Sequence, residues 1–238
     1  MQHIPKNITN EPQEFTDWKL RILPSDWQTT DKTPTHYWKE LCSQSDVFDK
    51  LQEKLLLEQG YLCCYCCCQI DNNQAEVPPN QRELLYISIE HLTTKESSRE
   101  GKENLAFDYL NLLASCNSKG SCNLKRNNQS LQINPCDNEI IAQITLERKG
   151  SDIKLKSDNP DLQKDIEEVL NLNNSALLGA RNQIAQKMRN EIATLQKSNK
   201  SGIEIKSELQ NKYTKLSEFG KYPAFVFVAH WVINKNFP

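Results

Sequence analysis

Apolar residues recur at helical spacing in four parts of the chain. Between residues 47 and 59 they return at steps of three and four, and Gly60 follows where a helix commonly ends in a left-handed residue. The same spacing predicts helices over residues 161–171 and 175–197, and a further helix over residues 204–216. The chain is therefore expected to be mainly helical.

Strict alternation of apolar and polar residues predicts strands in two other segments. Residues 84–91, LLYISIEH, alternate as a half-buried strand does, and the strand ends at Glu90 and His91. Residues 139–149 alternate in the same way, and residues 149–160 read as a polar turn region. The apolar run at residues 222–233 fits a buried strand or a helix, and we favour the helix.

These patterns divide the chain into three regions. Residues 1–60 form an N-terminal arm, rich in proline and aromatic residues, followed by one helix. Residues 61–135 hold the cysteine-rich segment, and residues 136–238 hold a strand and a helical scaffold expected to dock a partner. The predicted fold class is α+β, mainly helical.

Composition and charge limit the classes of function. Hydrophobic residues make up 37% and charged residues 25% of the chain, which is ordinary for a soluble globular protein. The net charge of −2 provides no global positive field, so binding of nucleic acid would depend on a local patch. The sequence shows neither a signal peptide nor an apolar run of the roughly 20 residues that span a bilayer. A cytoplasmic location without membrane contact is expected.

Nine cysteines in a chain expected in the reducing cytosol favour metal ligation over disulfides. Cys63 and Cys66 form a C-x-x-C pair, the spacing at which a tight turn directs two thiolates to one zinc ion. Cys116 and Cys122 are the only later pair close enough to each other to complete the site. We therefore predict a structural Zn²⁺ held by these four cysteines.

Two alternatives for the cysteines stay open. Cys64 and Cys67 have the same C-x-x-C spacing as the favoured pair, and the thiols could also be buried without a metal. The second pair is separated by five residues rather than the usual two, which leaves its geometry undefined. The remaining thiols, Cys42, Cys68 and Cys136, are interpreted as spare.

Catalytic residue types lie between and directly after the cysteine pairs. His91 has a side chain that titrates near pH 6.5 and can act as a general base toward water. Glu90 and the amide oxygen of Asn123 are the hard ligands that Mg²⁺ or Mn²⁺ prefers at a phosphodiester. The alternative for His91 is a structural histidine, which we also expect for the other histidines of the chain, and Glu90 could be only a strand-end carboxylate.

A local basic patch follows the second cysteine pair. No acidic residue occurs from Tyr109 to Cys136, whereas Lys119, Lys125 and Arg126 contribute three positive charges. Such a patch can bind phosphates without reading sequence. The alternative is a solvated polar face, but the position of two of these residues just after Asn123 favours phosphate binding.

The ordered set of motifs resembles a known nuclease family. The order C-x-x-C, acid–His, Asn, then C-Asn-x-x-basic is similar to the HNH branch of the ββα-metal nucleases. More closely, the chain resembles the PtuB-like HNH nucleases of Septu and retron-associated anti-phage systems. The matching segments are IPKNITNEPQEFTDWK, LCCYC, IEHL, YLNLLASC, CNLKR and VLNLNNSALLGAR, which together span most of the chain.

The resemblance implies a zinc-stapled ββα-metal core within a helical scaffold and a metal-dependent endonuclease of anti-phage defence. It implies that Asn111, counted with the catalytic set, holds the loop before the helix and orients His91. It also implies an ABC-type ATPase partner, PtuA-like, and in retron systems a reverse transcriptase with its msDNA. The chain has no G-x-x-x-x-G-K-[ST] motif of its own, so nucleotide sensing is expected in another chain.

Two questions stay open: which polymer is the substrate, and whether the chain is an enzyme at all. DNA is the favoured polymer, and transfer RNA is the alternative that the retron-associated relatives suggest. The alternative from another class is a non-catalytic zinc-ribbon adaptor that binds protein or nucleic acid. An adaptor should keep its activity in cells when His91 or Asn123 is replaced and lose it when Cys63 is replaced. A nuclease should lose its activity in both cases.

Overall fold

The computed structural model describes residues 1–26, 30–70, 87–95, 103–198 and 200–238. This part of the chain has an α+β fold dominated by helices, as predicted. The helices are α1 (Gln13–Ile22), α2 (Pro34–Ser43), α3 (Ser45–Glu58), α4 (Cys122–Arg126), α5 (Asn138–Ala142), α6 (Pro160–Lys164), α7 (Ser175–Gln196), α8 (Gly202–Tyr213) and α9 (Val226–Asn236). The strands are β1 (Ile87–His91), β2 (Leu112–Cys116), β3 (Thr145–Lys149) and β4 (Asp152–Lys156).

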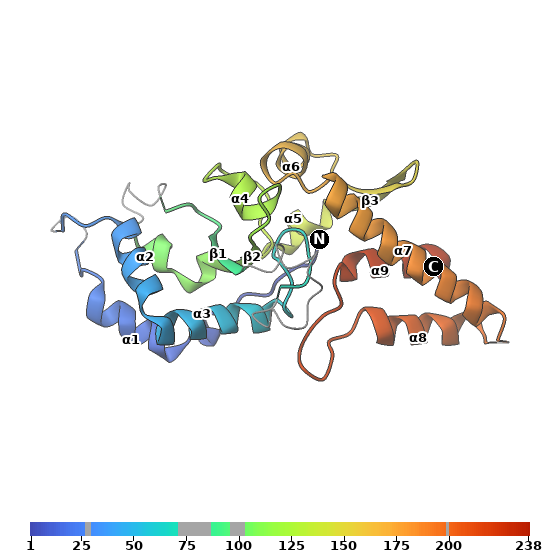
Figure 1. The fold of residues 1–238 in the computed structure, drawn as a ribbon, viewed down its shortest axis with the longest axis horizontal. Coiled ribbons are helices and arrows are strands. Elements are labelled where there is room, and N and C mark those ends of the chain that lie inside the picture. The colour runs from blue at the N-terminus through green and yellow to red at the C-terminus, as the bar shows by residue number, and fades with distance from the viewer. Residues whose placement is uncertain (27–29, 71–86, 96–102, 199) are drawn as a thin grey trace.

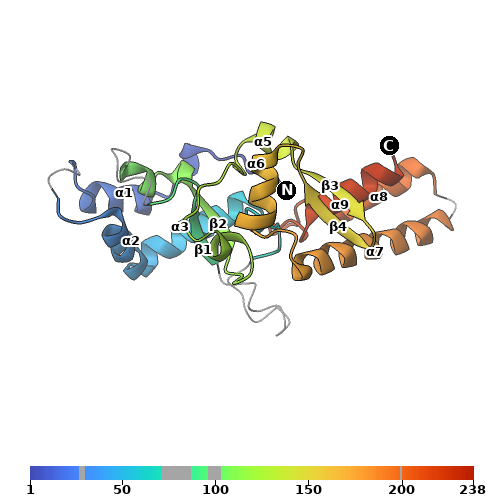
Figure 2. The same cartoon turned by 90° about the horizontal axis from the view of Figure 1, so that it is seen from above.

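The elements are arranged along an elongated body (Figure 1). Helices α1, α2 and α3 form one end, helices α7, α8 and α9 form the other, and β1, β2 and α4 lie between them. The view from above shows the same order, with α6 crossing near the middle (Figure 2). Within the described ranges, no helix combines the length and the apolarity needed to cross a membrane.

The N-terminal helices bury an aromatic and aliphatic core. Phe15 and Trp18 of α1 stack with ring centroids 6.3 Å apart, and α3 contributes Leu51 and Leu55 to the same core. The helix predicted over residues 47–59 is confirmed as α3. Gly60 follows it with φ +57°, and a Cβ there would lie 2.3 Å from the ring of Tyr222, so both the backbone and the space favour glycine at this position.

The central sheet consists of β1 and β2 in antiparallel register, with Ile87 opposite Cys116 and His91 opposite Leu112. The strand predicted before Glu90 is thus confirmed from residue 87 on, and its first residues, 84–86, lie outside the described residues. Helix α4 contacts β2, so the order strand, strand, helix is present in this region.

The predictions for residues 139–160 are partly wrong. Residues 138–142 form helix α5 rather than a strand, because the side chain of Asp137 accepts hydrogen bonds from the backbone N–H groups of Glu139 and Ile140. Strand β3 begins only at Thr145. The expected turn region contains a further strand, β4, whose alternate residues are buried and which contacts α7.

The helical predictions for the rest of the chain are confirmed with adjusted ends. Helix α6 begins at Pro160 and continues as a π-helical turn over Asp165–Val169. Helix α7 matches its prediction closely, and the apolar tail is helical as α9. Helix α9 contacts both α7 and α8, which together bury the second large part of the core.

Candidate functional site

Four cysteine sulfurs converge between the cysteine-rich turn and the central sheet. The Sγ atoms of Cys63, Cys66, Cys116 and Cys122 all lie within 4.8 Å of one another. Cys63 and Cys122 are 3.9 Å apart, and Cys66 and Cys116 are 3.8 Å apart. Four ligands at about 2.3 Å from a tetrahedral zinc have sulfurs roughly 3.8 Å from each other. The buried set therefore fits a zinc ion, as predicted.

Backbone hydrogen bonds give this turn its shape. The N–H of Cys63 donates to the carbonyl of Cys68 at 2.9 Å, and the N–H of Cys67, which has φ +58°, donates back to Cys63 at 3.0 Å. The N–H of Cys64 donates to Ala114 of β2 at 3.1 Å and fixes the turn to the sheet. The second pair of ligands lies at the end of β2 and the start of α4.

The four thiols shift one another's pKa values through their hydrogen bonds. A hydrogen bond from Cys122 lowers the pKa of Cys116 to about 6. Burial raises the pKa of Cys63, but its hydrogen bonds with the neighbouring thiols outweigh burial and lower that pKa well below its ordinary value. The pKa values of Cys66 and Cys122 are raised, first by their hydrogen bonds to Cys116. Zinc binding would therefore release the protons that these thiols retain.

The competing C-x-x-C pair lies outside the sulfur cluster. Burial raises the pKa of Cys64 well above its ordinary value, and burial raises that of Cys67 to about 11. Neither belongs to the four converging sulfurs. Cys68, interpreted as spare, has its Sγ 3.3 Å from that of Cys66, so it lies beside the centre without completing it.

Glu90 is buried against a tyrosine and an arginine. Its Oε1 accepts a hydrogen bond from the hydroxyl of Tyr65 at 2.8 Å and forms an ion pair with Arg126. Burial raises the pKa of Glu90, and the positive charge of Arg126 opposes that rise. Only 3% of Glu90 and 2% of Arg126 are exposed, so in this conformation the carboxylate is neutralised by the protein itself.

Arg126 connects α4 to the end of β1. Besides Glu90, its guanidinium donates to the carbonyls of His91 at 2.7 Å, Leu92 at 2.8 Å and Gln129 at 2.8 Å. These contacts use donors on all three guanidinium nitrogens, and the side chain faces the interior. Arg126 was predicted to bind a phosphate of the substrate. In this conformation its side chain is buried and cannot contact a phosphate at the surface.

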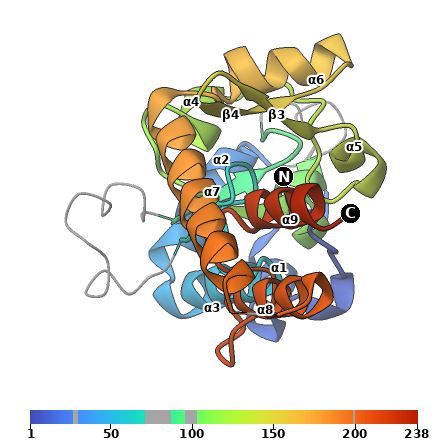
Figure 3. The ribbon, with the colours of Figure 1, turned by 90° about the vertical axis from the view of Figure 1, so that its right-hand side faces the viewer.

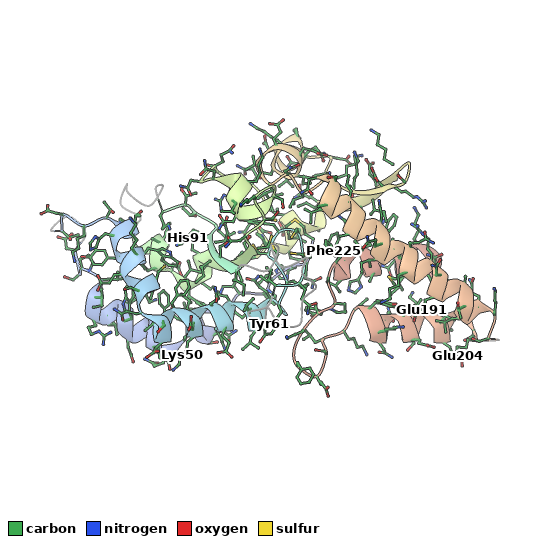
Figure 4. All side chains as sticks on the ribbon, in the orientation of Figure 1. Lys50, Tyr61, His91, Glu191, Glu204 and Phe225 are labelled. Atoms are coloured by element: carbon green, nitrogen blue, oxygen red, sulfur yellow. The ribbon has the colours of Figure 1, made fainter. Side chains whose placement is uncertain are left out.

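His91 points to the opposite face of β1, where it lies between this strand and α2 (Figure 4). Its ring meets Trp38 edge-on at 4.5 Å between centroids, and Nε2 lies 3.1 Å from the carbonyl of Ala106. Burial, and secondly Lys95, lowers the pKa of His91 to about 3. The ring is therefore neutral at pH 7, with the proton on Nε2, which donates to the carbonyl, and with Nδ1 unprotonated. The residue is 7% exposed.

Asn111 holds the loop that follows β1. Its Oδ1 accepts from the N–H of Thr93 at 2.7 Å, and its Nδ2 donates to the carbonyls of Thr93 at 2.9 Å and Leu105 at 2.8 Å. The resemblance implies that Asn111 holds the loop before the helix, whereas the loop that Asn111 holds in the structure joins β1 to β2. An effect of Asn111 on catalysis stays a prediction.

Asn123 lies on the Glu90 side of the strand. Its Nδ2 donates to the hydroxyl of Ser88 at 2.9 Å, and Ser88 shares a face of β1 with Glu90. Lys119 and Lys125 are exposed near the two ends of the loop and helix that carry Asn123. The structure thus places Asn123 and Glu90 on one side of β1 and His91 on the other.

Two residues of this region carry contacts that the sequence did not reveal. Tyr65 lies inside the cysteine turn and donates to Glu90, and Trp38 comes from α2 and covers His91. The position of Tyr65 between two predicted zinc ligands was visible in the sequence, but its partner was not. No signal in the sequence connected Trp38 to His91, because the two residues meet only through the fold.

The four-sulfur centre is the firmest chemical feature of this region. The oxygen donors proposed for a second cation are of the right chemical type, but Arg126 holds Glu90. No family model matches the chain, and no curated protein matches it.

Proposed function

We propose that this chain is a metal-dependent HNH endonuclease, similar to the PtuB-like nucleases, that hydrolyses phosphodiester bonds of nucleic acid. One observation carries the proposal: two antiparallel strands and a short helix follow one another, and four cysteines join them to the turn before β1. This is the element order that the HNH resemblance implies.

His91 is the proposed general base. Its neutral ring directs Nε2 to the carbonyl of Ala106, which leaves Nδ1 to accept a proton from water. Asn111 keeps the adjoining loop in place. Because only 7% of His91 is exposed, the proposal requires Trp38 or the adjoining loop to move when the substrate binds.

Glu90 and Asn123 are the proposed oxygen donors for Mg²⁺ or Mn²⁺. Such an ion, when bound, supplies positive charge that stabilises the phosphate during hydrolysis. Glu90 becomes available only when Arg126 releases it, so the described conformation corresponds to a state of low activity. The exposed side chains of Lys119 and Lys125 are proposed to contact phosphates of the substrate, and Arg126 joins them only after that release.

The biological setting follows from the family resemblance alone. We propose a cytoplasmic effector of anti-phage defence that acts with an ABC-type ATPase, and in a retron system also with a reverse transcriptase and its msDNA. Co-expression with an ABC-type ATPase of the proposed kind and purification through a tag on that partner tests the interaction. Absence of this chain from the purified complex would contradict it.

The decisive assay measures cleavage of plasmid DNA and of total transfer RNA by the purified chain with Mg²⁺ or Mn²⁺. We expect cutting of DNA that needs the cation and that is lost in His91→Gln. The matched control is His230→Gln, an exposed histidine on α9 that should leave the rate unchanged. Cutting of transfer RNA alone would name the alternative substrate. Equal cutting by wild type and His91→Gln would reject His91 as the base.

The zinc-ribbon adaptor remains a second candidate because of two observations. Glu90 is paired with Arg126 and His91 is covered by Trp38, so both side chains act structurally in this conformation. The adaptor predicts that Asn123→Ala leaves function in cells unchanged while Cys63→Ser abolishes it. Loss of function in both variants would favour the nuclease.

A further inference from the structure

Residues of β3, α7 and α9 line a small pocket. Figure 3 shows these three elements at the end of the molecule that carries the C-terminal helices. The pocket has a volume of about 250 Å³, which is enough for several water molecules or a small anion. It is lined by Arg148, Arg189, Trp231, Val232, Lys235 and Asn236. Three different elements thus contribute one cation each, and the lining contains no acidic residue.

These cations have no acidic side chain at the usual neighbouring positions. Along α7, the residues three and four positions from Arg189 are alanine, glutamine and isoleucine. Arg148 faces Ile153 across the β3–β4 pair, and Lys235 follows Val232 and Trp231 on its helix face. Among the ion pairs found for the described ranges, none involves these three cations.

The geometry keeps the positive charges close to one another. Burial lowers the pKa of Arg189, and the nearby charge of Arg148 lowers it further. Arg148 donates from Nε to the carbonyl of Gly150 at 3.2 Å, which leaves its two terminal nitrogens outside this bond. Lys235 Nζ lies 4.8 Å from the ring centroid of Trp231, a cation–π contact that orients it beside the pocket.

A pocket of this kind is complementary to an anion with several oxygens. Like charges repel when no counter-charge lies between them, and a bound anion would replace that repulsion with attraction. The guanidinium group presents its donors in a planar fork that matches phosphate oxygens, so two arginines and a lysine favour phosphate over a single carboxylate.

We propose that the pocket between β3, α7 and α9 binds a phosphate group, either of a nucleotide or of a nucleic-acid strand. The site lies on the C-terminal helical region and shares no residue with the cysteine centre or with His91. The pocket can therefore bind phosphate whether or not the chain is a nuclease.

Binding to the full-length chain is measured by isothermal titration calorimetry without added divalent cation, so that no cleavage occurs. The two probes are inorganic pyrophosphate and a single-stranded 12-mer oligodeoxynucleotide. In Arg189→Gln and in Arg148→Gln we expect the affinity to fall roughly tenfold or more, because each removes a charge-assisted hydrogen-bond donor. Lys149→Gln is the matched control, since it removes the same charge from the opposite face of β3.

The probes identify the source of the phosphate. Binding of pyrophosphate that depends on Arg189 supports a nucleotide site, and arginine-dependent binding of the oligonucleotide alone supports a nucleic-acid strand. Lack of binding of both probes to the wild type would overturn the proposal. Equal weakening by Lys149→Gln and Arg189→Gln would overturn it as well, because it would reveal only a general effect of charge. Circular dichroism of each variant confirms that α7 stays folded.

Discussion

The central region and the C-terminal helices are stabilised by different kinds of buried residue. The buried positions of β1 are Glu90 and His91, and those of α4 are Cys122 and Arg126. Helix α9, in contrast, buries only apolar side chains, and α7 buries mainly apolar ones. The centre therefore adds sulfur and polar contacts to the apolar side chains of β2, whereas the C-terminal region depends mainly on the hydrophobic effect. The two regions should respond differently to the same perturbation.

The largest difference is expected from loss of the metal. Cys66→Ser, or a strong zinc chelator, should unfold the central region while α7, α8 and α9 stay helical, because structural zinc contributes about 10–16 kcal/mol to folding in small domains. Zinc content by mass spectrometry and amide hydrogen exchange by region measure both effects. Cys42→Ser, at an exposed thiol, is the control. Uniform protection of the central amides after complete zinc loss would contradict the prediction.

Removal of one partner from the buried ion pair should have the next largest effect. Arg126→Met leaves Glu90 buried without its counter-charge, and we expect a loss of about 3–5 kcal/mol in the free energy of unfolding in urea. Lys212→Met breaks the exposed pair with Glu191 and should cost only about 0–1 kcal/mol. Similar losses in both variants would mean that the central pair is not the stronger contact.

Alanine substitutions at Gly60 and Gly150 separate the destabilisation caused by steric overlap from that caused by backbone strain. Gly60→Ala should destabilise the protein by about 2–4 kcal/mol, because the new Cβ overlaps the ring of Tyr222 and φ is +57°. Gly150→Ala also has positive φ, at +63°, but its Cβ meets no atom within 4 Å. It should cost only about 1–2 kcal/mol. Thermal unfolding of both variants measures the difference, and a larger loss at Gly150 would refute the steric explanation.

The smallest effect concerns pH. The folded pKa of His91 is lowered to about 3 from 6.5, so the unfolded chain binds a proton at His91 between these values and the folded chain does not. Stability therefore falls as the pH drops below about 6.5. Between pH 7 and pH 5 the wild type should lose about 2 kcal/mol more than His91→Gln. Urea unfolding at both pH values tests this, and equal losses would show that His91 titrates normally.

Local sequence patterns were sufficient for much of the fold. The spacing over residues 47–59 and 175–197 predicted α3 and α7, because long apolar stripes leave little doubt about the period. The alternating pattern wrongly predicted a strand at residues 139–142. These residues form helix α5, because the N-cap formed by Asp137 favours a helix more than a short alternation favours a strand. It also missed β4, since Ile153 and Leu155 are strand-like only when α7 is present to cover them.

The candidate site was predictable in its ligands but not in its surroundings. Cysteine spacing identified Cys63 and Cys66, and the structure resolves the competition with Cys64 and Cys67 by placing those two outside the cluster. The pairing of Glu90 with Arg126 was missed, although both residues had been named. Spacing along the chain shows which residues are near each other in sequence, whereas charge pairing across the core depends on how α4 lies on the strand.

The cysteine turn also receives hydrogen bonds from the far end of the chain. The N–H of Tyr222 donates to the carbonyl of Gly60 at 2.9 Å, and the N–H of Phe225 donates to the carbonyl of Cys67 at 2.8 Å. During synthesis the four cysteines that could hold zinc leave the ribosome well before these residues do. The nascent chain can therefore gather its sulfurs early, but the turn gains these long-range bonds only after translation reaches α9. Premature termination before Tyr222 would leave a metal-binding turn without its outer support.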